Sequence, residues 1–210
     1  MEQDIKSFLQ NFLERLKTID YVMPADIPNI DLYMDQVTTF MDEQLAASKR
    51  HEDDKILTKT MINNYAKNNL LPPPEKKKYS KEHVLTLIFI YYFKNILSIS
   101  DIQSILNPLT DKYFGNKDGL NMSDVYTEIF RTEAMESGKV LKDVGKKYHI
   151  AMESFEDFPE EDKNFLHTFS FICMLSYDVY IKKMLIEKAI DDLNAEKKDN
   201  KSQTSEEKKG

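Results

Sequence analysis

The chain is poor in the residues that form disulfides or cysteine-held metal sites: it has one cysteine among 210 residues. That cysteine, Cys173, excludes a disulfide within the chain and any zinc or iron–sulfur site that needs several cysteines. It lies in the apolar run Phe171–Met174, which predicts a packed position in a helix. The presence of a single cysteine fits a reducing compartment. Only 5 glycines and 7 prolines are present, so the sequence is neither fibrous nor of low complexity.

Long apolar runs are missing as well. The longest, Val84–Phe93, covers about half of the ~20 residues that a membrane-spanning helix needs. The first residues, MEQDIKSFLQNF, lack the basic stretch followed by an apolar stretch that marks a secretory signal. We therefore expect a cytoplasmic protein without membrane contact, and its 41% apolar residues are enough to bury a core.

Motifs that carry catalysis or hold cofactors are absent from the sequence. It has no glycine-rich phosphate loop and no nucleophile elbow, and none of its 4 histidines has a histidine or cysteine four residues away. The stretch Asn116–Gly119 resembles the start of a calcium loop, but Phe114 and Val125 then occupy the positions of the first and last acidic ligands. We therefore expect no enzymatic activity, no metal and no cofactor.

Positive charge is scarce overall but concentrated in one segment. The chain has 29 Lys and Arg against 36 Asp and Glu, a formal net charge of −7. From Lys49 to Lys81 nine basic residues face four acidic ones, so this segment carries +5 and the rest of the chain −12. Such an island indicates a phosphate-facing surface or, equally well, a solvated lysine face. Only three basic residues are arginines, so base recognition would depend mainly on amide and hydroxyl groups.

Helical periodicity dominates the sequence, and no long run alternates with the period of a strand, which predicts an all-α fold. The segment 81–96 is apolar almost all round and is the expected central core helix. Residues 195–210 lack large apolar side chains and are predicted to be disordered. Helices are predicted over residues 3–18, 31–47, 58–68, 81–96, 101–106, 121–148 and 159–193.

The sequence predicts two domains and a tail. The first spans residues 1–110, and the glycine-flanked stretch Gly115–Gly119 marks the linker that follows it. The second, residues 120–194, is a helical domain for dimerisation or effector binding. The tail covers residues 195–210.

The predicted helix over 58–68 has clear signals at both ends. Thr58 is a good N-cap, Asn69 can adopt the left-handed conformation that ends a helix, and Pro72–Pro74 prevents its continuation. The short segment Glu75–Tyr79 then allows only a small, tight wing before Ser80 caps the core helix. Leu57, Met61 and Tyr65 are expected inward, and the expected outward residues are Lys59, Thr60, Asn63, Asn64 and Lys67.

The run Leu57–Pro73 is similar to the recognition helix and turn of MerR-type regulators. The similarity covers residues 57–106, because Tyr79 and the apolar positions of the next two predicted helices match that family with one residue fewer before Ile99. Together with Pro28–Val37, the whole sequence resembles an uncharacterised bacterial family of unknown function that carries this MerR-like module. The resemblance implies a winged helix-turn-helix with a very short wing.

A MerR-like module implies a transcriptional regulator that places one helix in the major groove of double-stranded DNA and its wing on phosphates. Asn63 or Asn64 would pair with an adenine edge, and Lys59 would reach phosphate or guanine. A homodimer through the C-terminal helices and a small-molecule or protein effector would complete such a regulator. The implied DNA contacts are Thr58, Lys59, Thr60, Asn63, Asn64, Lys67, Lys76, Lys77, Lys78 and Tyr79.

Departures from the MerR pattern keep a second interpretation open. MerR proteins usually carry Arg-Tyr-Tyr in this helix, where the present chain has Asn63-Asn64-Tyr65, and the segment Ser48–Lys55 lengthens the turn before it. A protein-interaction module that retains the winged fold without binding DNA would fit these losses. A continuous basic face around Asn63 would favour DNA, whereas an exposed apolar patch over the helix would favour a protein partner.

Overall fold

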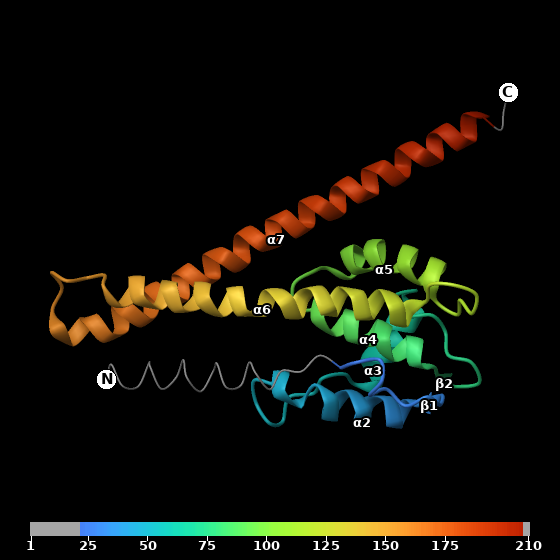
Figure 1. The fold of residues 1–210 in the computed structure, drawn as a ribbon, viewed down its shortest axis with the longest axis horizontal. Coiled ribbons are helices and arrows are strands. Elements are labelled where there is room, and N and C mark those ends of the chain that lie inside the picture. Colours follow the sequence, from blue (N-terminus) through green and yellow to red (C-terminus); the bar gives the residue numbers. More distant parts are fainter. Residues whose placement is uncertain (1–21, 208–210) are drawn as a thin grey trace. The chain divides into compact units, whose positions relative to one another are not determined.

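The computed structural model describes residues 22–207, apart from the side chains of residues 133–137 and 198–207. The chain is mostly helical with one small sheet, which confirms the predicted helical class (Figure 1). The predicted helix over 3–18 lies outside the described residues. The elements are β1 (Leu32–Tyr33), α2 (Met34–Gln44), the 3₁₀ helix η1 (Ala46–Ser48), α3 (Lys59–Lys67), β2 (Lys78–Tyr79), α4 (Lys81–Phe93), α5 (Ile99–Tyr113), α6 (Met122–Met152) and α7 (Glu160–Glu207).

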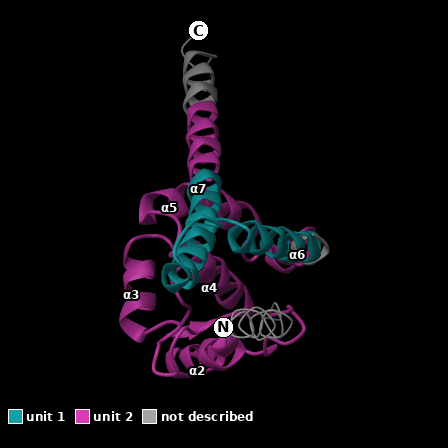
Figure 2. Cartoon of the chain, turned by 90° about the vertical axis from the view of Figure 1, so that its left-hand side faces the viewer, with its two compact units in different colours: residues 1–21, 128–182 teal, residues 22–127, 183–210 magenta. Residues whose placement is uncertain are grey.

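The chain forms two compact units, drawn in different colours in Figure 2. Within the described residues, unit 1 consists of residues 128–182, and unit 2 of residues 22–127 and 183–207. The predicted linker Gly115–Gly119 lies in the loop between α5 and α6, where both glycines have positive φ angles of 73° and 135°. Glycine suits these positions because a Cβ would strain them.

Helix α4 is the centre of unit 2, as predicted. Its residues from His83 to Tyr91 are all buried, so the helix is surrounded on every side. This explains why the segment shows no amphipathic pattern. The helices α2, α3 and α5 contribute one buried face each, through residues such as Val37, Ile62 and Ile102.

Strand β1 of the two-stranded sheet directly precedes α2, where the sequence predicted the first turn of a helix. Leu32 pairs with Tyr79 and Tyr33 with Lys78 in antiparallel register. Helix α2 therefore starts at Met34, and the Gln36 side chain accepts the Tyr33 N–H at 2.8 Å as its cap. The prediction was wrong because a two-residue strand is too short to show an alternating pattern.

Helix α5 starts earlier and ends later than predicted. Ser98 is its N-cap, although the sequence predicted a start at residue 101: the Ser98 hydroxyl accepts the Asp101 N–H at 3.2 Å. The helix passes through Pro108 and ends at Tyr113. Proline has no N–H, so it leaves the carbonyl four residues earlier unpaired within the helix. That carbonyl, on Ser104, accepts a hydrogen bond from Lys197 Nζ at 2.8 Å, which compensates for the loss.

Helix α7 departs from the predictions in two ways. It continues to Glu207, so residues 195–207 are helical rather than disordered. They contain good helix formers and no glycine or proline, and extending an existing helix costs little. In unit 1, Phe171 packs with Tyr148 and Ala151 of α6 in a small core, but Cys173 is exposed rather than buried.

Candidate nucleic-acid interface

Helix α3 is anchored by two buried residues and shows a polar face to solvent. Thr58 is its N-cap, as predicted, and its hydroxyl accepts the Met61 N–H at 3.2 Å. Ile62 and Tyr65 are buried, whereas Met61, predicted to point inward, is only half-buried. Figure 2 shows α3 at the outer edge of unit 2. The predicted outward residues are all exposed: Lys59, Thr60, Asn63, Asn64 and Lys67.

The end of α3 is fixed by its backbone. Asn69 has a φ of 54°, the left-handed conformation that the sequence predicted. The Leu70 N–H donates to the Tyr65 carbonyl at 2.8 Å and the Asn69 N–H to the Ala66 carbonyl at 3.2 Å. This pair of bonds is a Schellman motif, which ends a helix while satisfying its last carbonyls. The Gln103 side chain of α5 donates to the Asn68 carbonyl, so α5 also holds this end.

The predicted wing is a four-residue turn with two lysines at its tip. Lys76 and Lys77 have φ angles of 48° and 66°, and the Lys78 N–H donates to the Glu75 carbonyl at 2.8 Å. Two successive positive φ values define a type I′ turn, which strongly favours Asn-Gly. Holding a lysine in this conformation costs about 1 kcal/mol or more per residue. The turn therefore holds two exposed, adjacent lysines in a costly backbone conformation.

The base of the turn is less open than its tip. Lys78 is half-buried, and its Nζ lies 5.3 Å from the centroid of the Tyr33 ring across the sheet. Tyr79 is only 3% exposed, and its ring packs edge-on against His83. The predicted DNA contact through Tyr79 does not agree with this position, because a core side chain cannot reach a ligand at the surface. Tyr79 instead anchors β2 to α4.

The segment that forms α3 and the turn carries more lysines than acidic residues. No Asp or Glu occurs between Lys55 and Pro74. Among the described residues, no ion partner is found for Lys67, Lys76 or Lys77. Lys59 is the exception, since it pairs with Asp35 of α2 at the surface.

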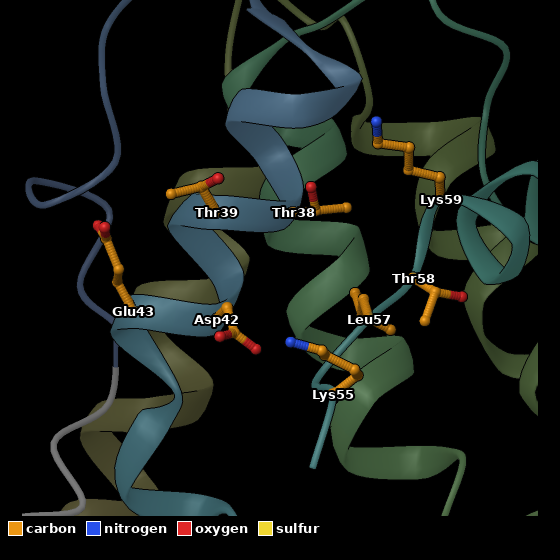
Figure 3. A pocket seen from close by; sticks show the side chains of 8 residues that line it. All are labelled: Thr38, Thr39, Asp42, Glu43, Lys55, Leu57, Thr58 and Lys59. Atoms are coloured by element: carbon orange, nitrogen blue, oxygen red, sulfur yellow. The ribbon is translucent and has the colours of Figure 1, made fainter. Parts of the chain in front are cut away.

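An open groove of about 420 Å³ separates α2 from the segment that leads into α3 (Figure 3). Lys49 donates to the Asp42 carboxylate at 2.8 Å, and this hydrogen bond lowers the pKa of Asp42. The groove is lined by two acidic and two lysine side chains, so its charges are of both signs. It is wide and open, which differs from the enclosed apolar cavity typical of small-molecule sites. The groove is lined by Thr38, Thr39, Asp42, Glu43, Lys55, Leu57, Thr58 and Lys59.

Exposed apolar residues are not gathered over α3. Among the described residues, none of the exposed large apolar side chains belongs to α3 or to the turn Glu75–Lys78. Tyr33, which is exposed, pairs with Lys78 across the sheet. This surface lacks the apolar patch that a helix-covering protein partner would require.

His83 supports both the turn and the end of α3. The Ser80 N–H donates to its Nδ1 at 2.9 Å, and its Nε2 lies 3.4 Å from the Pro73 carbonyl oxygen. This arrangement fits the neutral imidazole with its proton on Nε2. Burial lowers the pKa of His83 below its ordinary value, and the Pro73 carbonyl opposes that shift only in part.

This burial predicts acid sensitivity. Because unfolded His83 binds a proton more tightly than folded His83, stability falls as the pH decreases from about 7 toward the lowered pKa. Between pH 7.5 and 5.5 we expect the melting temperature of His83→Gln to fall less than that of the native chain, because glutamine does not titrate. The variant should still fold, since glutamine at this capping position also accepts the Ser80 N–H. Thermal unfolding at both pH values measures this, with the exposed His51→Gln as control; identical pH profiles for His83→Gln and the native chain would contradict it.

Other classes of site find no support in the described part of the chain. No group of three or more His, Cys, Asp or Glu side chains there is placed to hold a metal ion. No described helix combines the length and the apolar character needed to cross a bilayer.

A family model matches residues 22–129, just over half of the chain. The chain belongs to this family, which is described as Domain of unknown function (DUF1836). The match covers α2, α3, the turn, α4 and α5, and therefore the whole candidate interface. The family description assigns no activity. No curated protein and no solved structure matches the chain.

Proposed function

We propose that this DUF1836 chain is a sequence-specific DNA-binding transcriptional regulator with a MerR-like winged helix-turn-helix. In this proposal α2 and α3 are the two helices of the motif, and α3 enters the major groove. The turn Glu75–Lys78 is the wing, and β1 pairs with its second strand. Helix α2 packs against both α3 and β2, so one element sets the relative position of the two proposed DNA contacts.

The observation that carries the proposal is the strained lysine tip of the wing. A turn selected for stability alone would have Asn-Gly at these positions, yet two lysines occupy left-handed conformations there. Residues in costly backbone conformations are concentrated at functional sites. Adjacent exposed ammonium groups with no acidic partner suit phosphate, which is the most abundant anion on a DNA surface.

The residue types of α3 suit base reading. Asn63 and Asn64 are exposed and adjacent, and an asparagine amide can pair with the N6 and N7 atoms of adenine. Thr60 offers a hydroxyl and a methyl group, which suit phosphate or thymine. Lys59 and Lys67 stand at the two ends of the helix, where they can reach the flanking phosphate backbone.

A first experiment tests DNA binding without a known target. We expect the native chain to bind mixed-sequence duplex DNA with an affinity that falls steeply with salt, measured by fluorescence anisotropy. Replacing both Lys59 and Lys67 by Ala should reduce the slope of log affinity against log salt by about 1.8, because two phosphate contacts are lost. Replacing the exposed Lys112 and Lys117 should leave it unchanged. Equal slopes for the two variants would contradict the role of α3.

The ion pair between Lys59 and Asp35 gives a gain-of-affinity prediction. Asp35→Asn frees Lys59 and removes a negative charge next to the proposed interface. We expect an affinity for DNA about 2- to 5-fold higher, consistent with the small strength of exposed ion pairs. The control is Asp118→Asn, which changes the net charge equally but lies in the loop before α6. Equal effects of both substitutions would show that only net charge matters.

A protein-interaction module without DNA binding is the alternative function. It is favoured by the −12 charge outside the basic segment and by the absence of arginine from α3. The lack of exposed large apolar residues on α3 and its turn, among the described residues, speaks for DNA instead. If the folded chain bound no duplex at any salt concentration, the alternative would be favoured.

A further inference from the structure

The two-stranded sheet has a buried face and an exposed face. Leu32 and Tyr79 lie opposite each other in the register, and only 5% and 3% of their surfaces are exposed. Tyr33 and Lys78 are the other opposite pair, and they lie on the second face because side chains alternate along a strand. Tyr33 is 55% exposed. The second face therefore presents one aromatic ring and one lysine at the base of the turn Glu75–Lys78.

The ring and the ammonium group of this pair are in contact. Lys78 Nζ lies 5.3 Å from the centroid of the Tyr33 ring, within the distance of about 6 Å at which an aromatic face attracts a cation. Glu75 is the backbone partner of Lys78 in the turn, yet no ion pair of Lys78 with an acidic side chain is found among the described residues. An aromatic ring, and not a carboxylate, therefore holds this ammonium group.

The position of Tyr33 is not explained by the start of helix α2. Tyr33 is the N-cap of this helix, where Asn, Asp, Ser and Thr are preferred because their short side chains accept an N–H of the first turn. The Gln36 side chain caps the helix instead, by accepting the Tyr33 N–H at 2.8 Å. The core does not require the ring either, since more than half of the residue is exposed. The contact that remains for the ring is Lys78.

We propose that Tyr33 is a positioning residue of the DNA interface: its ring holds the ammonium group of Lys78 where this group binds a phosphate. The inference rests on the proposed function, in which the turn Glu75–Lys78 lies on the phosphate backbone. A side chain that is ordered before binding loses less conformational entropy when it binds than a freely rotating one. An ammonium group has three N–H donors, so a ring on one side leaves donors for a phosphate oxygen.

A purely structural contact is the rival explanation, and the two differ in what the loss of the ring changes. If the ring only stabilises the sheet, Tyr33→Leu lowers stability and leaves the DNA affinity of the folded chain unchanged. If the ring positions Lys78 for phosphate, the same substitution lowers the affinity of the folded chain, and it does so only while Lys78 is present.

The first test contains no DNA and measures whether the ring holds the lysine. Protons above an aromatic face resonate upfield, so the ε-CH₂ signal of Lys78 should lie upfield of its ordinary position in the NMR spectrum of the full-length chain. Lys78→Arg identifies this signal by removing it. Tyr33→Phe should keep the shift, because it keeps the ring, and Tyr33→Leu should abolish it. An ordinary signal position in the native chain would overturn the proposal.

The second test measures affinity for mixed-sequence duplex DNA by fluorescence anisotropy at near-physiological salt. Tyr33→Leu should weaken binding about 2- to 5-fold, which corresponds to the strength of an exposed cation–π pair, and Tyr33→Phe should bind like the native chain. In a Lys78→Ala background, Tyr33→Leu should have no further effect. Tyr113→Leu is the matched control and should bind normally, since it removes a similar pair at the end of α5, where Lys112 Nζ lies 5.1 Å from the ring centroid.

Three results of the second test would refute the positioning role while the native chain binds DNA. They are native affinity in Tyr33→Leu, an equal loss of affinity with and without Lys78, and a loss in Tyr33→Phe as large as in Tyr33→Leu. The last would assign the effect to the hydroxyl group and not to the ring. If the folded native chain bound no duplex, the proposed function would fail together with the DNA role of Tyr33, so the two failures are distinguishable.

Discussion

Replacing Lys76 by Asn and Lys77 by Gly should weaken DNA binding about 30-fold at 0.15 M salt, while making the protein more stable. Loss of two phosphate contacts lowers the salt slope by about 1.8, which corresponds to that factor at this salt concentration. The stability should rise by about 1 kcal/mol or more, because Asn-Gly adopts the type I′ turn without the strain of two lysines. Fluorescence anisotropy across a salt series and urea unfolding measure the two effects.

The opposite signs of these effects separate charge from turn geometry. Lys76→Arg with Lys77→Arg is the matched control, because it keeps both charges and the strain; we expect nearly native affinity and stability. If the Asn-Gly variant bound DNA as tightly as the native chain, the turn would not contact phosphate. If it were also less stable, the assigned turn conformation would be wrong.

Adjacent positions in α3 should show opposite phenotypes. Ile62 is 0% exposed, so Ile62→Ala should lower the free energy of unfolding by about 2 to 5 kcal/mol through lost burial and a cavity. Asn63 is exposed, so Asn63→Ala should change stability by no more than about 0.5 kcal/mol. Its affinity for a preferred duplex should fall by about 1 to 3 kcal/mol, the value of a bidentate pair with adenine.

Urea unfolding and anisotropy with a preferred duplex measure both quantities for both variants. Asn64→Ala, measured in the same way, identifies the asparagine that reads the base, because only the variant that lacks this asparagine loses its preference for the duplex. A stability loss in Asn63→Ala comparable with that of Ile62→Ala would place Asn63 in the core. Unchanged affinity in both asparagine variants would exclude α3 as the base-reading element.

The parts of the fold that local chemistry determines were predictable from the sequence. The N-cap Thr58, the left-handed Asn69 and the tight turn after the three prolines lie where their residue types place them. Helix α4 was identified as the core because its apolar residues leave no polar face. The outward face of α3 followed from the same spacing and determined most of the candidate site.

The missed features depend on contacts between distant segments. The strand β1 exists because Leu32 and Tyr33 find Lys78 and Tyr79, more than forty residues away. For the same reason Tyr79 is in the core, although its neighbours Lys76 and Lys77 are at the surface. Local sequence shows residue types but not which segments will pair.

Helix α7 illustrates a different limit. The sequence predicted a helix over residues 159–193 and a homodimer through the C-terminal helices, but it did not show which apolar positions of α7 pack within the chain. Among the side chains of α7 that the structure describes, only Phe171 and Ile190 are buried, and Cys173 is exposed. Periodicity indicates that a face requires cover, and it does not indicate whether the same chain or another copy provides that cover.

The most direct test of the proposed function is selection of duplexes from fragments of the source genome at near-physiological salt, with the native chain and a Lys59→Ala, Asn63→Ala double variant in parallel. We predict that the native chain enriches fragments sharing one site and that the folded double variant does not. Enrichment of the same site by both chains would show that α3 does not recognise the bases through Lys59 and Asn63. No enrichment by the folded native chain would contradict sequence-specific DNA binding and favour the protein-interaction module.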